Sequence, residues 1–92
     1  MILKISTESG WRFIDNVEDV FIHQDSADNI AAQGNDCPTE WMDFDKHLPV
    51  DMERDYKVLK LKKNDSLCNR IVIKNNTVYL LNDEGKTIER IN

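Results

Sequence analysis

The chain has 92 residues, an ordinary fraction of hydrophobic residues and a net charge of −5, which limits it to a single domain of residues 1–92 around one hydrophobic core. No apolar run approaches the ~20 residues that cross a bilayer, and the first residues lack the basic leader and cleavage site of a signal peptide, so we expect a cytoplasmic protein. An acidic chain repels phosphate, which argues against direct binding of nucleic acid.

Charge is distributed unevenly along the chain. Residues 24–55 carry nine acidic and two basic residues, whereas residues 56–92 carry four acidic and eight basic residues. The middle segment is therefore an acidic insert, and the last third is mildly basic. The insert can bind a basic groove on another protein, because its carboxylates would attract that surface.

The first part of the chain predicts a β-hairpin followed by a further strand. Alternation of side chains over residues 2–7 and 11–14 predicts two strands, and the polar break at residues 8–10 contains a glycine that suits a tight turn. Residues 20–23 are mostly β-branched or aromatic and predict a third strand.

The acidic insert, about residues 24–55, contains both prolines and shows little periodicity. Residues 28–33 are compatible with one or two helical turns, because a glycine follows them. A short helix is expected at about residues 39–47, with Thr39 as its N-cap. Its apolar face would be formed by Trp41, Phe44 and Leu48.

The last third of the chain predicts a series of antiparallel strands. They are expected at residues 56–62, 67–74, 77–81 and 87–91. Asn75 and Asn76 suit a two-residue turn between the second and third of these strands. Gly85 suits the left-handed position of a longer turn before the last strand.

Together these patterns predict a mostly β fold, a β-rich α+β arrangement in which an antiparallel meander forms a bent sheet or a small barrel. Strands are expected at about residues 2–23 and 56–91, and the acidic insert carries one short helix. A two-stranded hairpin alone is marginally stable, so the strands must share a sheet or close on one another.

We expect neither a metal site nor a catalytic group. The potential ligands His23, Cys37 and His47 lack the short spacing of zinc-binding pairs. The aspartates beside His47 would fan around the expected helix instead of converging. Cys37 lies in acidic surroundings that disfavour a reactive thiolate. Both Cys37 and Cys68 are expected as free thiols in a reducing cytosol, and one disulfide between them is the alternative. The expectation is a non-enzymatic protein without a cofactor.

Basic side chains within residues 56–74 form one candidate surface. With Tyr56 and Tyr79 as stacking groups, they could line a site for single-stranded nucleic acid or hold a phosphate ligand. The alternative is that the acidic insert folds across this surface and neutralises it, which the negative total charge favours. The basic residues are Lys57, Lys60, Lys62, Lys63, Arg70 and Lys74.

The acidic insert contains the candidate partner-binding site. Aromatic and apolar side chains are surrounded there by carboxylates, a composition typical of an anchor that is steered to a basic surface on a protein partner. The candidate residues are Glu40, Trp41, Met42, Asp43, Phe44 and Asp45. The alternative, which the helical spacing of the aromatic residues favours, is that Trp41 and Phe44 hold the insert against the sheet.

The segments Ile5-Ser-Thr-Glu-Ser-Gly-Trp11 and Tyr79-Leu-Leu-Asn-Asp-Glu-Gly85, with the small size, the acidity and the abundance of Asn and Lys, resemble short accessory proteins of bacteriophages and prophages. The resemblance implies a host-takeover or counter-defence role, in which a host factor is inhibited or a nucleotide signal is sequestered. We therefore expect a binding protein that inhibits a partner protein with a basic surface. A small oligomeric protein that sequesters a nucleotide-type ligand, or a part of a larger assembly, are the alternatives.

Overall fold

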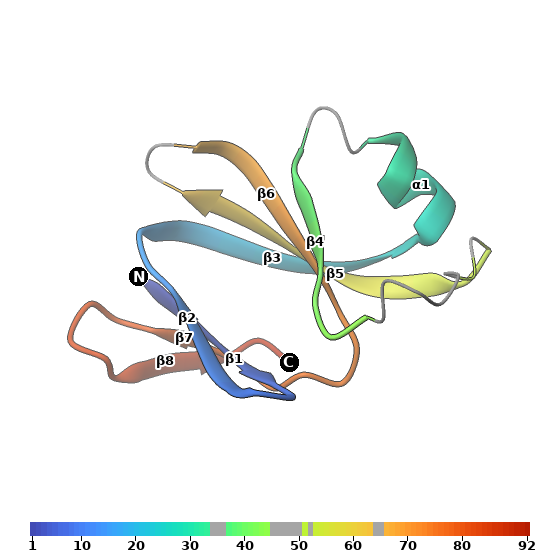
Figure 1. Cartoon of the computed structure of the whole chain (residues 1–92). Helices are drawn as coiled ribbons and strands as arrows, with labels where there is room; N and C mark the ends of the chain where they lie inside the picture. The colour runs from blue at the N-terminus through green and yellow to red at the C-terminus, as the bar shows by residue number, and fades with distance from the viewer. Residues whose placement is uncertain (34–36, 45–50, 52, 64–65) are drawn as a thin grey trace.

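The computed structural model describes the chain except residues 34–36, 45–50, 52 and 64–65 and the side chains of residues 66–68. The described strands form two four-stranded sheets that lie face to face, with one short helix beside the second sheet (Figure 1). Sheet A has the order β2-β1-β7-β8, with β1 at Ile2–Thr7, β2 at Gly10–Ile14, β7 at Val78–Leu81 and β8 at Thr87–Arg90. Sheet B has the order β3-β5-β6-β4, with β3 at Val17–Ser26, β5 at Asp55–Lys63, β6 at Ser66–Ile73 and β4 at Thr39–Trp41.

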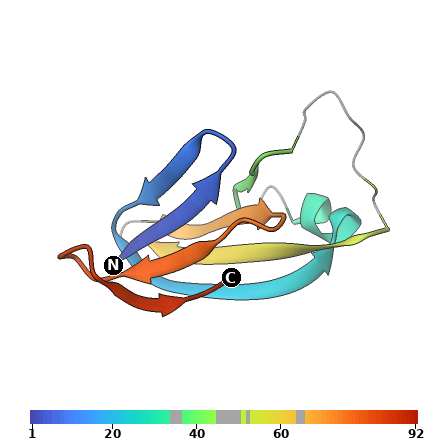
Figure 2. The same cartoon turned by 90° about the horizontal axis from the view of Figure 1, so that it is seen from below.

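The expected mostly β fold with one short helix in the acidic insert is confirmed. Of the two forms that the sequence allowed, the small closed barrel is not formed, because the strands divide into two separate open sheets. The two sheets are seen from below in Figure 2, where both chain termini belong to sheet A.

Two local predictions in sheet A are confirmed. The first hairpin joins β1 to β2 in antiparallel register, with Lys4 opposite Phe13 and Ser6 opposite Trp11. The β7–β8 hairpin forms as expected, and Gly85 in its turn has a φ of 86°, a left-handed conformation that glycine adopts without steric cost.

The expected hairpin at Asn75 and Asn76 is wrong, because β6 belongs to sheet B and β7 to sheet A. The chain passes between the sheets at this point. Asn76 is buried, accepts a hydrogen bond from the Lys74 N–H (2.9 Å), and donates to the Ser6 carbonyl (2.7 Å) and the Asp43 carboxylate (3.0 Å). The Asn76 side chain thus links three segments through these hydrogen bonds. An asparagine in this role cannot be distinguished by sequence from an asparagine in a turn.

The expected helix at about residues 39–47 is also wrong in its described part. Residues 39–41 form β4, which pairs with β6 in parallel register, with Thr39 opposite Arg70 and Trp41 opposite Val72. The helix α1 lies earlier, at Ala27–Ala32, where the sequence is compatible with helical turns. Its N-cap is Ser26, whose hydroxyl accepts a hydrogen bond from the Asn29 N–H at 3.2 Å, a common helix start.

Two hydrophobic clusters hold the layers together. The larger cluster lies between the sheets and the smaller lies on the opposite face of sheet B, under α1. Residues of the first are Leu3, Ile5, Val17, Met42, Leu59, Leu61, Ile71, Ile73, Val78 and Leu80. Residues of the second are Ile30, Val58 and Val72, with Trp41, Phe44 and Tyr56 packed against them. The acidic insert is therefore fixed to the sheet through its apolar residues.

Candidate functional site

The large apolar residues of the expected partner-binding segment pack against the protein itself. Met42 is 4% exposed and belongs to the cluster between the sheets. Trp41 and Phe44 meet edge to face at 5.3 Å between ring centroids, and each contacts Tyr56, at 5.7 and 5.6 Å. This geometry is favourable for aromatic pairs, and it fastens the insert to β5.

Two acidic residues of that segment are engaged in contacts within the chain. Glu40 forms an ion pair with Arg12 of β2 at 2.5 Å. Asp43 has a φ of 57°, and its carboxylate accepts hydrogen bonds from the Glu8 N–H (3.2 Å) and the Asn76 side chain (3.0 Å). Asp45 lies outside the described residues. The structure therefore brings residues 40–44 together in contacts that join the insert to both sheets.

The sequence candidates for chemistry do not converge within the described part of the chain. There, no three His, Cys, Asp or Glu side chains are grouped as metal ligands. Cys37 is buried and disulfide-bonded, so the expectation of a free thiol at Cys37 is wrong. His47 and the side chain of Cys68 lie outside the described residues.

The basic residues expected to form one surface are divided among different environments. Arg70 is 4% exposed, and its guanidinium donates to the Ile30 carbonyl (2.9 Å), to Gln33 (3.1 Å) and to Thr39 (3.1 Å). It thus joins the C-terminal end of α1 to β4. Tyr56 and Tyr79, the expected stacking pair, lie on different sheets, so they cannot form one platform.

A different surface is exposed on the outer face of sheet A, and we call it the aromatic–basic face. Residues opposite each other in register share a face of a sheet, and Lys4 lies opposite both Phe13 and Tyr79, while Tyr79 lies opposite Arg90. The buried residues of β1 alternate with Lys4 and point to the other side. The aromatic–basic face consists of Lys4, Trp11, Phe13, Tyr79 and Arg90.

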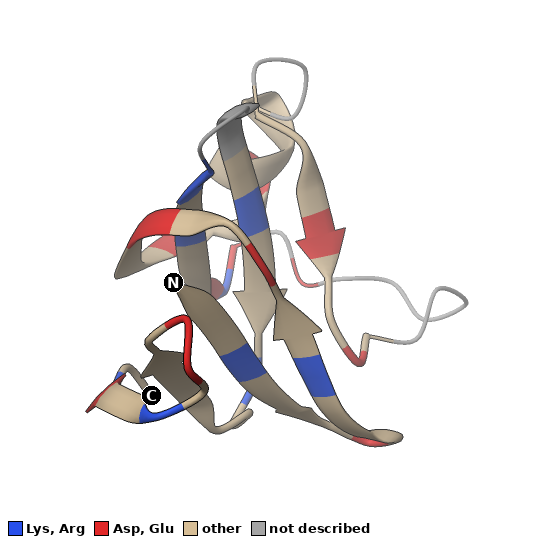
Figure 3. Ribbon diagram, turned by 90° about the vertical axis from the view of Figure 1, so that its left-hand side faces the viewer, with Lys and Arg blue, Asp and Glu red and all other residues tan. Residues whose placement is uncertain are grey.

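The aromatic–basic face is open to solvent, and the Lys4 ammonium lies among its aromatic rings. Trp11 is 50% exposed and Phe13 56% exposed. The Lys4 ammonium lies 4.3 Å from the Trp11 ring centroid and 6.0 Å from those of Phe13 and Tyr79. Figure 3 shows one basic position on β1 and one on β2; the first is Lys4, and the second is Arg12, which is not part of this face. In the described part of the chain no carboxylate pairs with Lys4.

Sequence reasoning missed this face although its signal was present. Trp11 and Phe13 alternate along a strand whose partner strand fills the core with Leu3 and Ile5. Once the hairpin register is assumed, both aromatic residues must lie opposite Lys4 and Ser6, on the outer face. The missing information was that β7 would lie on the other side of β1 and bring Tyr79 to the same surface.

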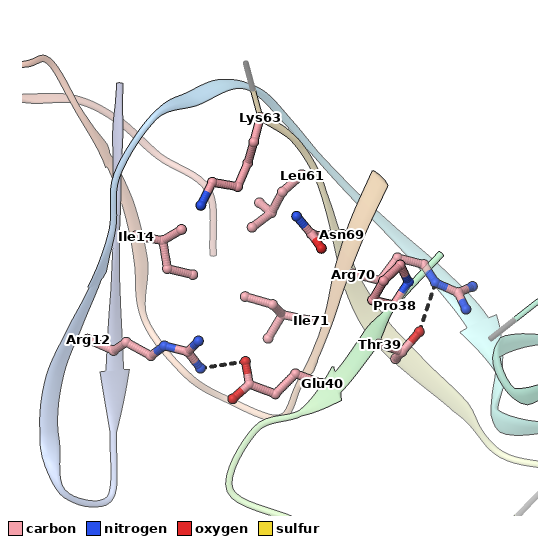
Figure 4. Close-up of a pocket in the computed structure, with 10 residues that line it drawn as sticks. All are labelled: Arg12, Ile14, Pro38, Thr39, Glu40, Leu61, Lys63, Asn69, Arg70 and Ile71. Atoms are coloured by element: carbon pink, nitrogen blue, oxygen red, sulfur yellow. Dashed lines mark hydrogen bonds and ion pairs between the residues drawn. The ribbon is translucent and has the colours of Figure 1, made fainter. Parts of the chain in front are cut away.

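A pocket of about 320 Å³ opens between the two sheets (Figure 4). Its walls combine apolar residues from both sheets with charged residues at the rim. The lining residues that the structure describes are Arg12, Ile14, Pro38, Thr39, Glu40, Leu61, Lys63, Asn69, Arg70 and Ile71.

Comparisons with protein-family models, with curated proteins and with solved structures find no significant match for this chain. The described helix has six residues, which is too short to cross a membrane.

Proposed function

We propose that this chain is a non-enzymatic binding protein that inhibits a partner protein by covering part of its surface, and that the aromatic–basic face makes the contact. The observation that carries the proposal is the exposure of Trp11 and Phe13 beside Lys4 on an open sheet. Grouped exposed aromatic residues are typical of interaction surfaces. The resemblance to phage accessory proteins favours a host factor as the partner.

The chemistry of the face favours a partner surface that combines apolar residues with carboxylates. The Lys4 ammonium makes cation–π contacts with the rings of Trp11, Phe13 and Tyr79. A partner carboxylate above Lys4 would gain a charge-assisted hydrogen bond to the ammonium group, and the exposed rings beside it would be covered by the apolar part of the partner surface. This differs from the basic partner surface expected from the acidic insert, because residues 40–44 are occupied by contacts within the chain.

Two phenylalanines provide a matched test of the proposal. Phe13 on sheet A is 56% exposed and Phe21 on sheet B is 57% exposed, so their truncation to alanine removes similar exposed area from different sheets. Partner would be captured from host extract by tagged wild-type, Phe13→Ala and Phe21→Ala proteins, identified by mass spectrometry, and its affinity measured by calorimetry. An aromatic anchor contributes about 2 kcal/mol, so Phe13→Ala should weaken binding about 30-fold.

Phe21→Ala should bind as the wild type does, and both variants should unfold at the same urea concentration as the wild type. Equal affinity of the Phe13→Ala and Phe21→Ala proteins would contradict the proposal.

A second measurement tests binding of nucleic acid. Single-stranded oligonucleotides are titrated into a Trp41→Phe variant, and the fluorescence of Trp11, its remaining tryptophan, should stay unchanged. Quenching that saturates and weakens with salt would instead identify a stacking platform for single strands.

A further inference from the structure

The pocket between the sheets exists because the edge strands on that side do not pair. β2 is an edge strand of sheet A and β4 is an edge strand of sheet B, and each has a neighbour only within its own sheet. The described contact that crosses between them is the ion pair of Arg12 with Glu40. The sandwich is therefore open along this side, where none of the described strands fills the space.

The inner wall of the pocket is apolar and comes from both layers. Ile14 extends from β2, while Leu61 and Ile71 extend from β5 and β6 (Figure 4). Leu61 and Ile71 are nearly fully buried and belong to the main core, so this wall is held in place by packing. A rigid apolar wall favours a ligand with a flat or compact apolar body.

The rim of the pocket carries an excess of positive charge. Among the described lining residues, Arg12 and Lys63 contribute two cations at the rim and Glu40 contributes one carboxylate, whereas the Arg70 guanidinium is directed to α1. The register shift between Leu61 and Lys63 places Lys63 opposite Ser66 on β6, and its side chain extends toward the open space beside Ile14 (Figure 4). In the described part of the chain no carboxylate pairs with Lys63.

We propose that this pocket binds a small organic anion whose single phosphate or carboxylate group meets Lys63 and Arg12 and whose apolar body covers Ile14, Leu61 and Ile71. The ion pair with Glu40 orients the Arg12 guanidinium and leaves further N–H donors of the fork for the ligand. A volume of about 320 Å³ lies at the lower end of the range of small-molecule sites, which suits a ligand of one ring with one anionic group. This site is separate from the aromatic–basic face, since Arg12 and Ile14 alternate with Trp11 and Phe13 along β2.

Phenyl phosphate and benzoate are the probes, and their binding is followed by ¹H–¹⁵N correlation spectra of the labelled full chain. The amide signals of Ile14, Asn69 and Ile71 should move with either anion and saturate at about millimolar concentration. Benzylammonium, with the same ring and the opposite charge, should leave them unchanged. A larger affinity for phenyl phosphate than for benzoate assigns the site to phosphate esters, and the reverse assigns it to carboxylates.

The matched variants are Lys63→Gln and Lys60→Gln, on the same strand. Lys60 lies opposite Phe21 and Arg70, on the other face of sheet B. Loss of a charged hydrogen bond should weaken binding of the anions about tenfold or more in Lys63→Gln, and Lys60→Gln should bind within about twofold of the wild type. The assignment would be overturned if Lys63→Gln bound the anions with unchanged affinity or if benzylammonium gave an equal response. Movement of the Trp11 and Tyr79 signals instead of those of the pocket would overturn it as well.

Discussion

Replacement of Met42 by alanine tests whether Met42 is a core residue or an exposed residue that contacts a partner. Met42 lies in the segment that the sequence assigns to partner binding, yet it is 4% exposed and packs between the two sheets. Its backbone N–H also donates to the Val72 carbonyl at 3.0 Å, which fixes the segment against β6. Truncation of a buried methionine removes its transfer free energy and leaves a cavity, at a cost of about 3 kcal/mol.

That cost is a large part of the stability of a chain of this size, which is of the order of 5–14 kcal/mol. With a urea dependence of about 1.5 kcal/mol per molar, the unfolding midpoint of Met42→Ala should fall by about 2 M. Met42→Leu conserves the volume and should stay within about 1.5 kcal/mol of the wild type. If Met42→Ala unfolded at the wild-type urea concentration, the residue would be at the surface and the packing of the insert described above would be incorrect.

Three further replacements test other contacts, each by urea unfolding. Arg70→Met leaves the Ile30 carbonyl and the Thr39 and Gln33 side chains without their donor and should cost about 2–4 kcal/mol of stability. A single ammonium group cannot replace the guanidinium fork. Full wild-type stability in Arg70→Lys would therefore refute the role of Arg70 as a multiple hydrogen-bond donor. Asp43→Ala should cost about 1–3 kcal/mol, because two hydrogen bonds are lost and because alanine tolerates the left-handed φ of 57° less well than aspartate does. Asp43→Asn keeps an acceptor oxygen and should cost less than about 1 kcal/mol. Equal losses of stability in the two variants would argue against these hydrogen bonds. Gly85→Ala should cost about 1 kcal/mol from its backbone conformation alone, because no atom lies within 4 Å of the added Cβ, and a neutral result would contradict the φ of 86°.

The hairpin of β1 and β2 and the hairpin of β7 and β8 each join strand-forming segments through a short turn with a glycine at positive φ, so both are predictable from nearby residues. The strands predicted at residues 20–23, 56–62 and 67–74 also form, as parts of or in overlap with β3, β5 and β6. The partition of the strands into two sheets depends on pairing over long distances, such as Ile5 with Val78. No pattern within a single segment carries that information.

The acidic insert shows why the helix at residues 39–47 was mispredicted. Trp41 and Phe44 are three positions apart, which is helical spacing. The same spacing arises here because a strand ends at Trp41 and the chain then turns through Asp43, with its positive φ, to bring Phe44 back onto Tyr56. A parallel pairing with β6, to which Arg70 and its bonds to Thr39 contribute, outweighs the local preference.

The proposed contact surface on sheet A rests on the same distinction between core and exposed residues. On the first hairpin, the core positions are filled by Leu3 and Ile5, and the exposed Trp11 and Phe13 add little to the burial that stabilises the sandwich. Replacing both by serine should therefore leave the urea midpoint within about 0.5 M of the wild type while it abolishes partner capture. If the double variant unfolded at a much lower urea concentration, the two rings would be needed for stability. Their exposure would then not support a binding role for the aromatic–basic face.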